Sequence, residues 1–187
     1  MPAPRDRLLS AAVSLIRQRG VAGTGLSELL KESGTARGSI YQHFPRGKDD
    51  LVAAAVAGAG SEGRDLFATL SALGDPAAAV TAIMQVTRDA LVADGYLHGC
   101  PVAAGALAGP DYPAAVRTAA GALAGWVEEL TDVFAALGLA ADAARPFASV
   151  VVSVFEGALV QARATRSPEL LDHAAAQLAA LARAQLA

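Results

Sequence analysis

The sequence predicts an all-α fold, and its composition is the first reason. Of the 187 residues, 53% are hydrophobic and 18% are charged, a balance typical of chains that fold around an apolar core. Alanine supplies much of the hydrophobic fraction, whereas β-branched and aromatic residues occur mainly in short runs. Helix is therefore favoured wherever glycine and proline do not interrupt the chain. We expect about nine helices, in a three-helix N-terminal domain of residues 1–50 and a helical bundle of residues 51–187.

Hydrophobic periodicity predicts the three helices of the N-terminal domain. Apolar residues recur at helical spacing through residues 5–19, and Gly20 ends this stretch. A shorter amphipathic helix is predicted at residues 26–33, after which Gly34 supplies a sharp turn. A third helix follows at residues 36–43. Three short helices with a glycine turn between the second and the third are the pattern of a helix-turn-helix.

The third helix is predicted to have a core face and an outer face. Ile40 and Phe44 are four residues apart, so we expect them to face the core, together with Ala36. The other side chains of this helix are predicted to point outward: Arg37, Gly38, Ser39, Tyr41 and Gln42.

Caps and prolines mark the helices of the larger domain. Asp75 followed by proline is a helix start, as is the segment that begins at Ser167. Gly58, Gly60 and Gly63 fall inside the first helix of this domain and are the predicted place for a bend between the two domains. The predicted helices are residues 48–73, 76–94, 113–137, 145 or 146 to 163, and 169–187, with a short helix inside the segment 95–112.

The net charge of −3 is unevenly distributed along the chain. Residues 1–50 hold eight Lys or Arg against five Asp or Glu, a net charge of +3. Residues 51–187 hold the other seven against thirteen, a net charge of −6. This asymmetry indicates a small basic domain that faces a polyanion and a larger acidic body.

A helix-turn-helix places its second helix in the DNA major groove, so residues 36–43 are predicted to read bases. Arg37 can donate two hydrogen bonds to guanine or bind phosphate, Gln42 can read adenine, and Ser39 can serve either purpose. Tyr41 has an alternative as a packing residue. The predicted phosphate contacts are Tyr41, His43 and Lys48. The complete set of predicted DNA-binding residues is Ser27, Thr35, Arg37, Gly38, Ser39, Tyr41, Gln42, His43 and Lys48.

Cysteine usage and hydropathy bear on compartment and cofactors. Cys100 is the single cysteine, which excludes an intrachain disulfide and fits a reducing compartment. Residues 5–16 mimic a signal peptide only superficially, because Asp6 lies in the would-be basic region and no small-residue cleavage site follows. We expect no membrane span and a cytoplasmic protein. His98 and Cys100 fall short of a metal site, so we expect no metal and no cofactor.

A resemblance to a known family rests on residues 34–51, GTARGSIYQHFPRGKDDL, and on the preceding LLSAAVSLIRQRGVAGTGLSELLKESG. This stretch resembles the N-terminal domain of the TetR family of transcriptional regulators. The segment FPRGKDDL has one residue more than the commoner FPSKEDL pattern, and with HGCPVA at residues 98–103 it is similar to the LmrA/YxaF-like subgroup. The resemblance implies a homodimer whose body holds an effector pocket, and the subgroup implies sensing of small hydrophobic molecules.

Two positions depart from the family pattern. Gly25 and Ala36 stand where most members have a Ser or Thr that caps the second and third helices. Thr24 and Thr35 stand beside them and are the predicted replacements for those caps.

A ligand site in the body is predicted from its large or polarizable side chains, because small-molecule sites are mostly apolar with a few polar groups. Phe67, Met84 and Phe155 have the alternative of plain core positions, and Cys100 is either a thiol sensor or an inert buried cysteine. The predicted effector-binding residues are Phe67, Met84, Tyr96, His98, Cys100, Tyr112, Trp126 and Phe155.

A dimer interface is predicted on the last two helices. The final helix carries apolar residues at three-four-three spacing, and the helix before it is unusually apolar. Two such helices from each chain would form a four-helix isologous contact. The predicted interface residues are Val150, Val154, Leu171, Ala174, Leu178 and Leu181.

These features favour a ligand-responsive repressor that binds a palindromic DNA operator as a dimer and is released by a small hydrophobic effector. One alternative keeps the DNA-binding domain but makes the body a protein-interaction module without an effector. A second is a helical enzyme that uses Glu156 or Glu128 with His98. The sequence has no phosphate loop, nucleophile motif or metal cluster, so we expect no enzyme.

Overall fold

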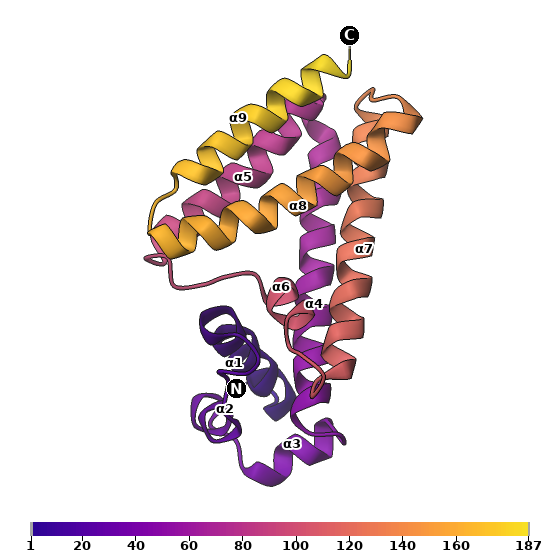
Figure 1. Cartoon of the computed structure of the whole chain (residues 1–187). Coiled ribbons are helices and arrows are strands. Elements are labelled where there is room, and N and C mark those ends of the chain that lie inside the picture. Colours follow the sequence, from indigo (N-terminus) through magenta and orange to yellow (C-terminus); the bar gives the residue numbers. More distant parts are fainter. Residues whose placement is uncertain (1, 187) are drawn as a thin grey trace. The chain divides into compact units, whose positions relative to one another are not determined.

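The computed structural model describes residues 2–186, and in this part of the chain it contains nine α-helices, one 3-10 helix and no strand (Figure 1). The predicted all-α fold is confirmed. The elements are α1 (Pro4–Arg19), α2 (Leu26–Ser33), α3 (Arg37–His43), α4 (Lys48–Ala68), η1 (Thr69–Leu73), α5 (Pro76–Ala93), α6 (Pro101–Ala106), α7 (Pro113–Ala136), α8 (Ala141–Thr165) and α9 (Glu169–Ala184).

The chain packs as two compact units. In unit 1, the residues up to Ser61 pack with Cys100–Ala122, and in unit 2, Glu62–Gly99 pack with the chain from Leu123 onward. The boundaries of these units differ from those of the predicted domains 1–50 and 51–187, because α6 and the first part of α7 pack with the N-terminal helices. The long helices α4 and α7 each begin in unit 1 and end in unit 2.

The core of unit 1 joins the three N-terminal helices to the start of α4. Leu8, Leu29, Ile40, Phe44 and Leu51 come from α1, α2, the C-terminal end of α3 and α4, and none is more than 3% exposed. Helix α1 packs against α2, α3 and α6 (Figure 1). The shared apolar core therefore holds the two helices of the helix-turn-helix at a fixed angle.

Unit 2 is built mainly from α5, α8 and α9, and α9 packs most extensively on α5 (Figure 1). Asp75 caps α5 as predicted, because its carboxylate accepts hydrogen bonds from the amides of Ala77 and Ala78 at 3.1 Å each. Phe134 of α7 and Phe147 of α8 meet edge to face with ring centroids 4.8 Å apart.

The observed helix bounds differ from the predicted ones in two places. Helix α8 begins at Ala141 rather than near residue 145, so Pro146 lies inside its first two turns. Pro146 has no backbone N–H, so the carbonyl of Asp142 lacks its helical hydrogen bond. Both residues are exposed near the helix end, where water can bind this carbonyl instead. The predicted fourth helix changes after Ala68 into the 3-10 turn η1.

Two of the three glycines inside α4, which runs without interruption from Lys48 to Ala68, have close neighbours on α7. The bend expected at these glycines stays a prediction, and the division between the two units, at Ser61 and Glu62, falls within this stretch. A Cβ added at Gly60 would lie 2.7 Å from the Cβ of Ala122, and one added at Gly63 would lie 2.7 Å from ring atoms of Trp126. Gly58, in contrast, has nothing within 4 Å of such an atom. Gly60 and Gly63 therefore allow α7 to approach α4 closely.

Among the described helices, α8 is the one that is long and apolar enough to span a membrane by length and composition. In the structure α8 contacts α5 and α9, and Phe147, Val151 and Leu159 are buried inside unit 2. This packing is typical of an apolar core helix in a bundle.

Candidate nucleic-acid interface

Helices α2 and α3 are joined by a turn at Gly34. Gly34 adopts a left-handed conformation (φ 61°, ψ 34°) and ends α2, and its amide and that of Thr35 both donate to the carbonyl of Leu30. Arg7 of α1 also binds this turn, since its Nε donates to the carbonyl of Ser33 at 3.0 Å and its guanidinium reaches the carbonyl of Gly34 at 3.4 Å. The role of Arg7 could not be predicted from the sequence, because its partners lie 26 and 27 residues away in the chain.

Neither threonine replaces the missing helix caps. The cap positions of α2 and α3 are Gly25 and Ala36, and neither helix has a side-chain cap. The hydroxyl of Thr24 donates to the carbonyl of Gly20 at 2.8 Å, and the hydroxyl of Thr35 pairs with that of Ser33 at 2.8 Å. Both predicted replacements are wrong, because each hydroxyl already has a partner on the preceding segment.

The two faces of α3 largely match the prediction. Ile40 is fully buried and Phe44, at the C-terminal end, is 3% exposed. Ala36 is exposed rather than buried, because it precedes the helix in an extended conformation. Tyr41 is 50% exposed, and its ring lies close to Gly47. The side chains presented to solvent belong to Arg37, Tyr41, Gln42 and His43, with Ser39 half-buried and Gly38 exposed.

Two predicted residues lie outside this helix. Ser27 is exposed on α2. Thr35 is half-buried in the turn, where its hydroxyl is bound to that of Ser33. Thr35 is therefore less accessible to DNA than the outer face of α3.

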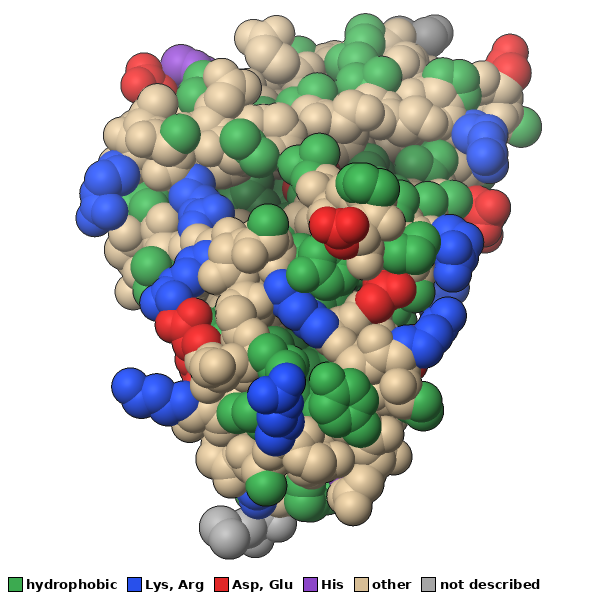
Figure 2. Space-filling model, turned by 60° about the horizontal axis from the view of Figure 1, so that its bottom comes forward, with side chains coloured by type: hydrophobic (Ala, Val, Ile, Leu, Met, Phe, Trp, Pro, Cys, Tyr) green, Lys and Arg blue, Asp and Glu red, His purple; other side chains and the backbone are tan. Residues whose placement is uncertain are grey.

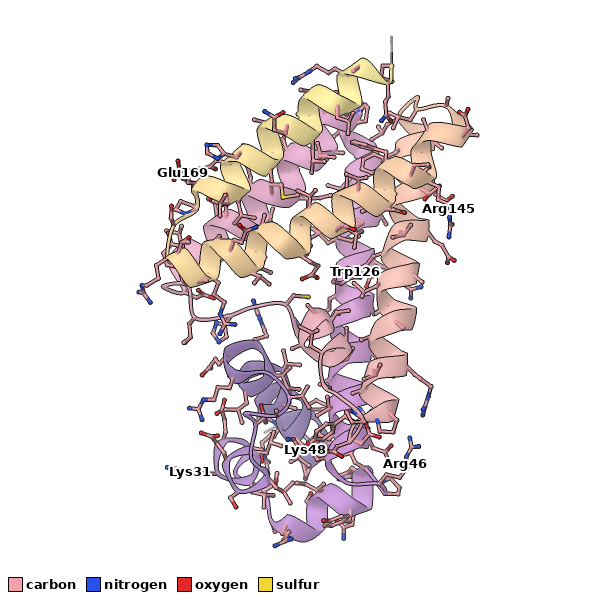
Figure 3. The ribbon with its side chains drawn as sticks, viewed as in Figure 1. Lys31, Arg46, Lys48, Trp126, Arg145 and Glu169 are labelled. Atoms are coloured by element: carbon pink, nitrogen blue, oxygen red, sulfur yellow. The ribbon has the colours of Figure 1, made fainter. Side chains whose placement is uncertain are left out.

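The side chain of Lys48 has partners that the sequence did not predict. Its Nζ donates to the backbone carbonyl of Val21 at 2.7 Å and to the hydroxyl of Tyr112 at 2.9 Å, and it lies 4.7 Å from the centroid of the Tyr112 ring. Figure 3 labels Lys48 at the start of α4. Two of its three N–H groups bind within unit 1, so the predicted phosphate contact has no support in this conformation.

Two further basic residues lie beside α3. Arg46 is exposed and forms an ion pair with Asp50 at 2.6 Å, and a hydrogen bond and the charge of each partner raise the pKa of Arg46 and lower that of Asp50. Arg5 is exposed at the start of α1, with its guanidinium 5.8 Å from the centroid of the Phe44 ring. Figure 2 shows Lys and Arg side chains spread over the face that it brings forward, with fewer Asp and Glu among them.

The predicted effector residues are divided between the two units, and three of them meet in unit 2. Phe67, Trp126 and Phe155 meet in unit 2, with ring centroids 5.6 Å apart for the first pair and 6.4 Å for the second (Figure 3 labels Trp126). Phe67 and Trp126 are each 4% exposed. Met84 is buried on α5 at 1% exposure.

The remaining predicted effector residues have other partners. Tyr96, in a left-handed conformation, lies under the guanidinium of Arg166, and His98 pairs with Asp94 at 2.9 Å. Cys100 and Tyr112 belong to unit 1, where the sulfur of Cys100 accepts from the amide of Ala103 at 3.5 Å and Tyr112 binds Lys48. Within residues 2–186, no group of three or more His, Cys, Asp or Glu side chains is arranged to hold a metal ion.

The predicted dimer residues divide by burial. Leu171, Ala174 and Leu178 are at most 8% exposed, because this side of α9 packs within unit 2 on α5 and α8. They are core residues and are not free to meet a partner. Val150 and Leu181 are 42% and 41% exposed, and Val154 is half-buried. The sequence pattern showed an apolar side of α9 but not which neighbour covers it.

The fold and this site define a class: a helix-turn-helix at the N-terminus of a helical protein. The family described as "Bacterial regulatory proteins, tetR family" matches residues 8–55, and "Transcriptional regulator LmrA/YxaF-like, C-terminal domain" matches residues 76–177. The chain belongs to the TetR family of transcriptional regulators, with a C-terminal domain of the LmrA/YxaF-like kind. Its family and fold are those of DNA-binding transcriptional regulators rather than of enzymes.

Individual relatives agree with this family. An uncharacterized HTH-type transcriptional regulator of Mycobacterium tuberculosis, Rv0196, is 31% identical over 192 residues, which span 100% of this chain and 97% of the relative. The HTH-type transcriptional regulator LmrA of Bacillus subtilis is 36% identical over 99 residues, 52% of this chain and 53% of LmrA. Among solved structures, Escherichia coli NemR in its reduced form superimposes with a TM-score of 0.80 and 26% identity, covering 94% of this chain and 96% of NemR.

Proposed function

We propose that the chain is a cytoplasmic repressor that binds a palindromic operator as a homodimer and leaves it when a small hydrophobic effector binds the body. The observation that carries the DNA-binding part is the outer face of α3, where Arg37 and Gln42 are exposed while Ile40 and Phe44 anchor the helix in the core. A helix held in this way can lie in the major groove with its polar side chains facing the bases.

Arg37 and Gln42 are proposed to read bases. Replacing Gln42 by Ala is expected to relax the preference at one operator position in each half-site, at about 1 to 3 kcal/mol for the lost base contact. Replacing Arg37 by Ala is expected to act similarly at a guanine. Both effects are measured as affinities for a set of operators with single base changes.

The matched control for these variants is Arg145→Ala, because Arg145 is exposed at the start of α8 in unit 2. It removes one positive charge without touching α3. A loss of affinity that is equal on all operators would make Arg37 or Gln42 a phosphate contact instead of a base contact.

The dimer is proposed to use the exposed apolar residues of α8 and α9. Val150 and Val160 on α8 are 42% and 59% exposed, and Leu181 on α9 is 41% exposed. Two recognition helices related by a two-fold axis can read half-sites about one helical turn, roughly 34 Å, or a multiple of it apart. An operator of this kind is an inverted repeat.

The effector is proposed to bind beside the aromatic cluster of Phe67, Trp126 and Phe155. These three rings are the largest apolar group of the predicted set that unit 2 brings together. An aromatic wall of this kind favours a hydrophobic ligand.

The function is tested by a binding selection on random duplex DNA with the purified chain. Recovery of an inverted repeat is expected, and it would report the symmetry and the half-site spacing together. A selection that enriches no motif would refute the repressor function.

The alternative function keeps the DNA-binding unit but makes the body a protein-interaction module. A library of small hydrophobic compounds distinguishes the two, because a ligand that prefers the non-binding state must raise the melting temperature and weaken operator binding. Failure of all compounds in both assays would favour the protein-interaction module.

A further inference from the structure

Helix α7 receives its N-terminal cap from another helix. It begins at Pro113, and the side chain of the preceding residue, Tyr112, is occupied with Lys48 instead of capping. The carboxylate of Asp49, in the first turn of α4, accepts hydrogen bonds from the amides of Ala114 at 3.2 Å and Ala115 at 3.0 Å. One carboxylate therefore stabilises the positive ends of two helix dipoles, because α4 and α7 start side by side.

Lys48 binds two further segments next to Asp49. Its Nζ joins the carbonyl of Val21, in the connection between α1 and α2, to the hydroxyl of Tyr112, just before α7. We call the group of Lys48, Asp49, Val21, Tyr112 and the first amides of α7 the α4–α7 junction. Through this junction two adjacent residues hold together three segments of unit 1 that are far apart in sequence.

The junction lies next to the recognition helix. Helix α3 ends at His43 and α4 starts at Lys48, so residues 44–47 alone separate them. Phe44 is locked in the core, and Gly47 makes a turn with φ of 71°. The short connection leaves α3 little freedom to move independently of the first turn of α4.

We propose that Lys48 and Asp49 are positioning residues that fix the direction in which α3 is presented to DNA, by fastening the first turn of α4 to the start of α7. The proposal rests on the proposed function as a dimeric DNA-binding protein. In a dimer the direction of each α3 sets the distance between the two recognition helices, so the junction determines which operator spacing is bound.

The chemistry of the junction opposes a direct phosphate contact by Lys48. Two of its three N–H groups are engaged, and the carboxylate of Asp49 stands next to it in the chain. A phosphate bound here would compete with these partners for Nζ, and the negative charge of the adjacent residue, Asp49, disfavours a second anion.

The test compares Asp49→Ala with its matched control Asp111→Ala. Asp111 is exposed in the segment before α7, so its replacement removes the same charge close by without removing a cap. Affinities are measured for the operator that the wild-type chain selects and for the same operator lengthened by one central base pair. The wild-type chain should prefer the selected spacing, and Asp49→Ala should reduce that preference roughly five- to tenfold, the effect of a lost cap. Asp111→Ala should leave it unchanged.

If Asp49 had a purely structural role, Asp49→Ala would lower the stability of the protein but leave the preference for operator spacing unchanged. Hydrogen exchange without DNA shows whether the amides of Ala114 and Ala115 have lost their partner in Asp49→Ala. Faster exchange there with an unchanged spacing preference would overturn the proposal. If Asp49→Ala does not fold, Tyr112→Phe provides the second variant, since it removes only one acceptor of Lys48, and its spacing preference should fall about two- to fivefold.

Lys48→Met separates positioning from phosphate binding. The salt dependence of operator binding should keep the wild-type slope while the spacing preference falls, because no phosphate contact is lost. A slope flattened by about one unit with an unchanged spacing preference would make Lys48 a phosphate contact and overturn the proposal. A wild-type chain that selects no inverted repeat would instead refute the proposed function itself.

Discussion

Replacing Phe44 by Ala is expected to lower the free energy of unfolding by about 3 to 5 kcal/mol, the usual effect of truncating a buried Phe. Phe44 is 3% exposed at the end of α3, and Ile40 and Leu51 of the same unit are fully buried. A loss of this size is a large fraction of the stability of a typical domain, about 5 to 15 kcal/mol in total. Urea denaturation of the purified variant measures it, as a lower midpoint at an unchanged slope.

The adjacent residue supplies the control for this variant. His43 is exposed, so His43→Ala should change stability by no more than about 0.5 kcal/mol. If His43 contacts phosphate, as the sequence predicts, the same variant should weaken operator binding. A Phe44→Ala variant as stable as His43→Ala would contradict the assignment of Phe44 to the core.

The second large effect is expected where α4 and α7 touch in unit 2. Replacing Gly63 by Ala should destabilise the protein by about 1 to 3 kcal/mol, because the new Cβ would lie 2.7 Å from atoms of the Trp126 ring. Trp126 is 4% exposed and is held between Phe67 and Phe155, so it has little room to withdraw. Chemical denaturation measures the stability, and the emission of the single tryptophan reports any displacement of the ring.

Gly58→Ala is the matched control in the same helix. No atom lies within 4 Å of its added Cβ, so this variant should gain about 0.5 to 1 kcal/mol from the better helix propensity of alanine. The two variants make the same chemical change in one helix and are expected to have opposite signs. Equal stabilisation by both variants would show that the Trp126 ring can move away from the new Cβ without a loss of stability.

The local features of the fold could be predicted from the sequence. The bounds of α2 were predicted correctly, as was the turn at Gly34, because a short amphipathic run followed by glycine leaves few other conformations. The inward direction of Ile40 and Phe44 also followed from helical spacing. The family was indicated by one segment of 18 residues, 34–51, whose types and spacing are specific.

The errors concern side chains whose partners are distant in sequence. Lys48 carries the positive charge expected of a phosphate contact, but its Nζ binds the hydroxyl of Tyr112, which lies 64 residues away in the chain. The close contacts of Gly60 and Gly63 with Ala122 and Trp126 of α7 could not be predicted, because these neighbours lie far away in the chain. Leu171 and Leu178 form the apolar stripe that was predicted, but packing within unit 2 buries it inside the chain.

The sequence by itself determined the helices, the helix-turn-helix and the family, because helix formation, turns and caps depend on residues within a few positions of one another. Only the tertiary structure decided what Lys48 and Asp49 bind, and which side of α9 remains exposed. These choices depend on which apolar faces are buried together and on which polar groups then need partners. Asp49 shows the difference most clearly, since its sequence position marks the start of α4 and its carboxylate caps α7, 65 residues away.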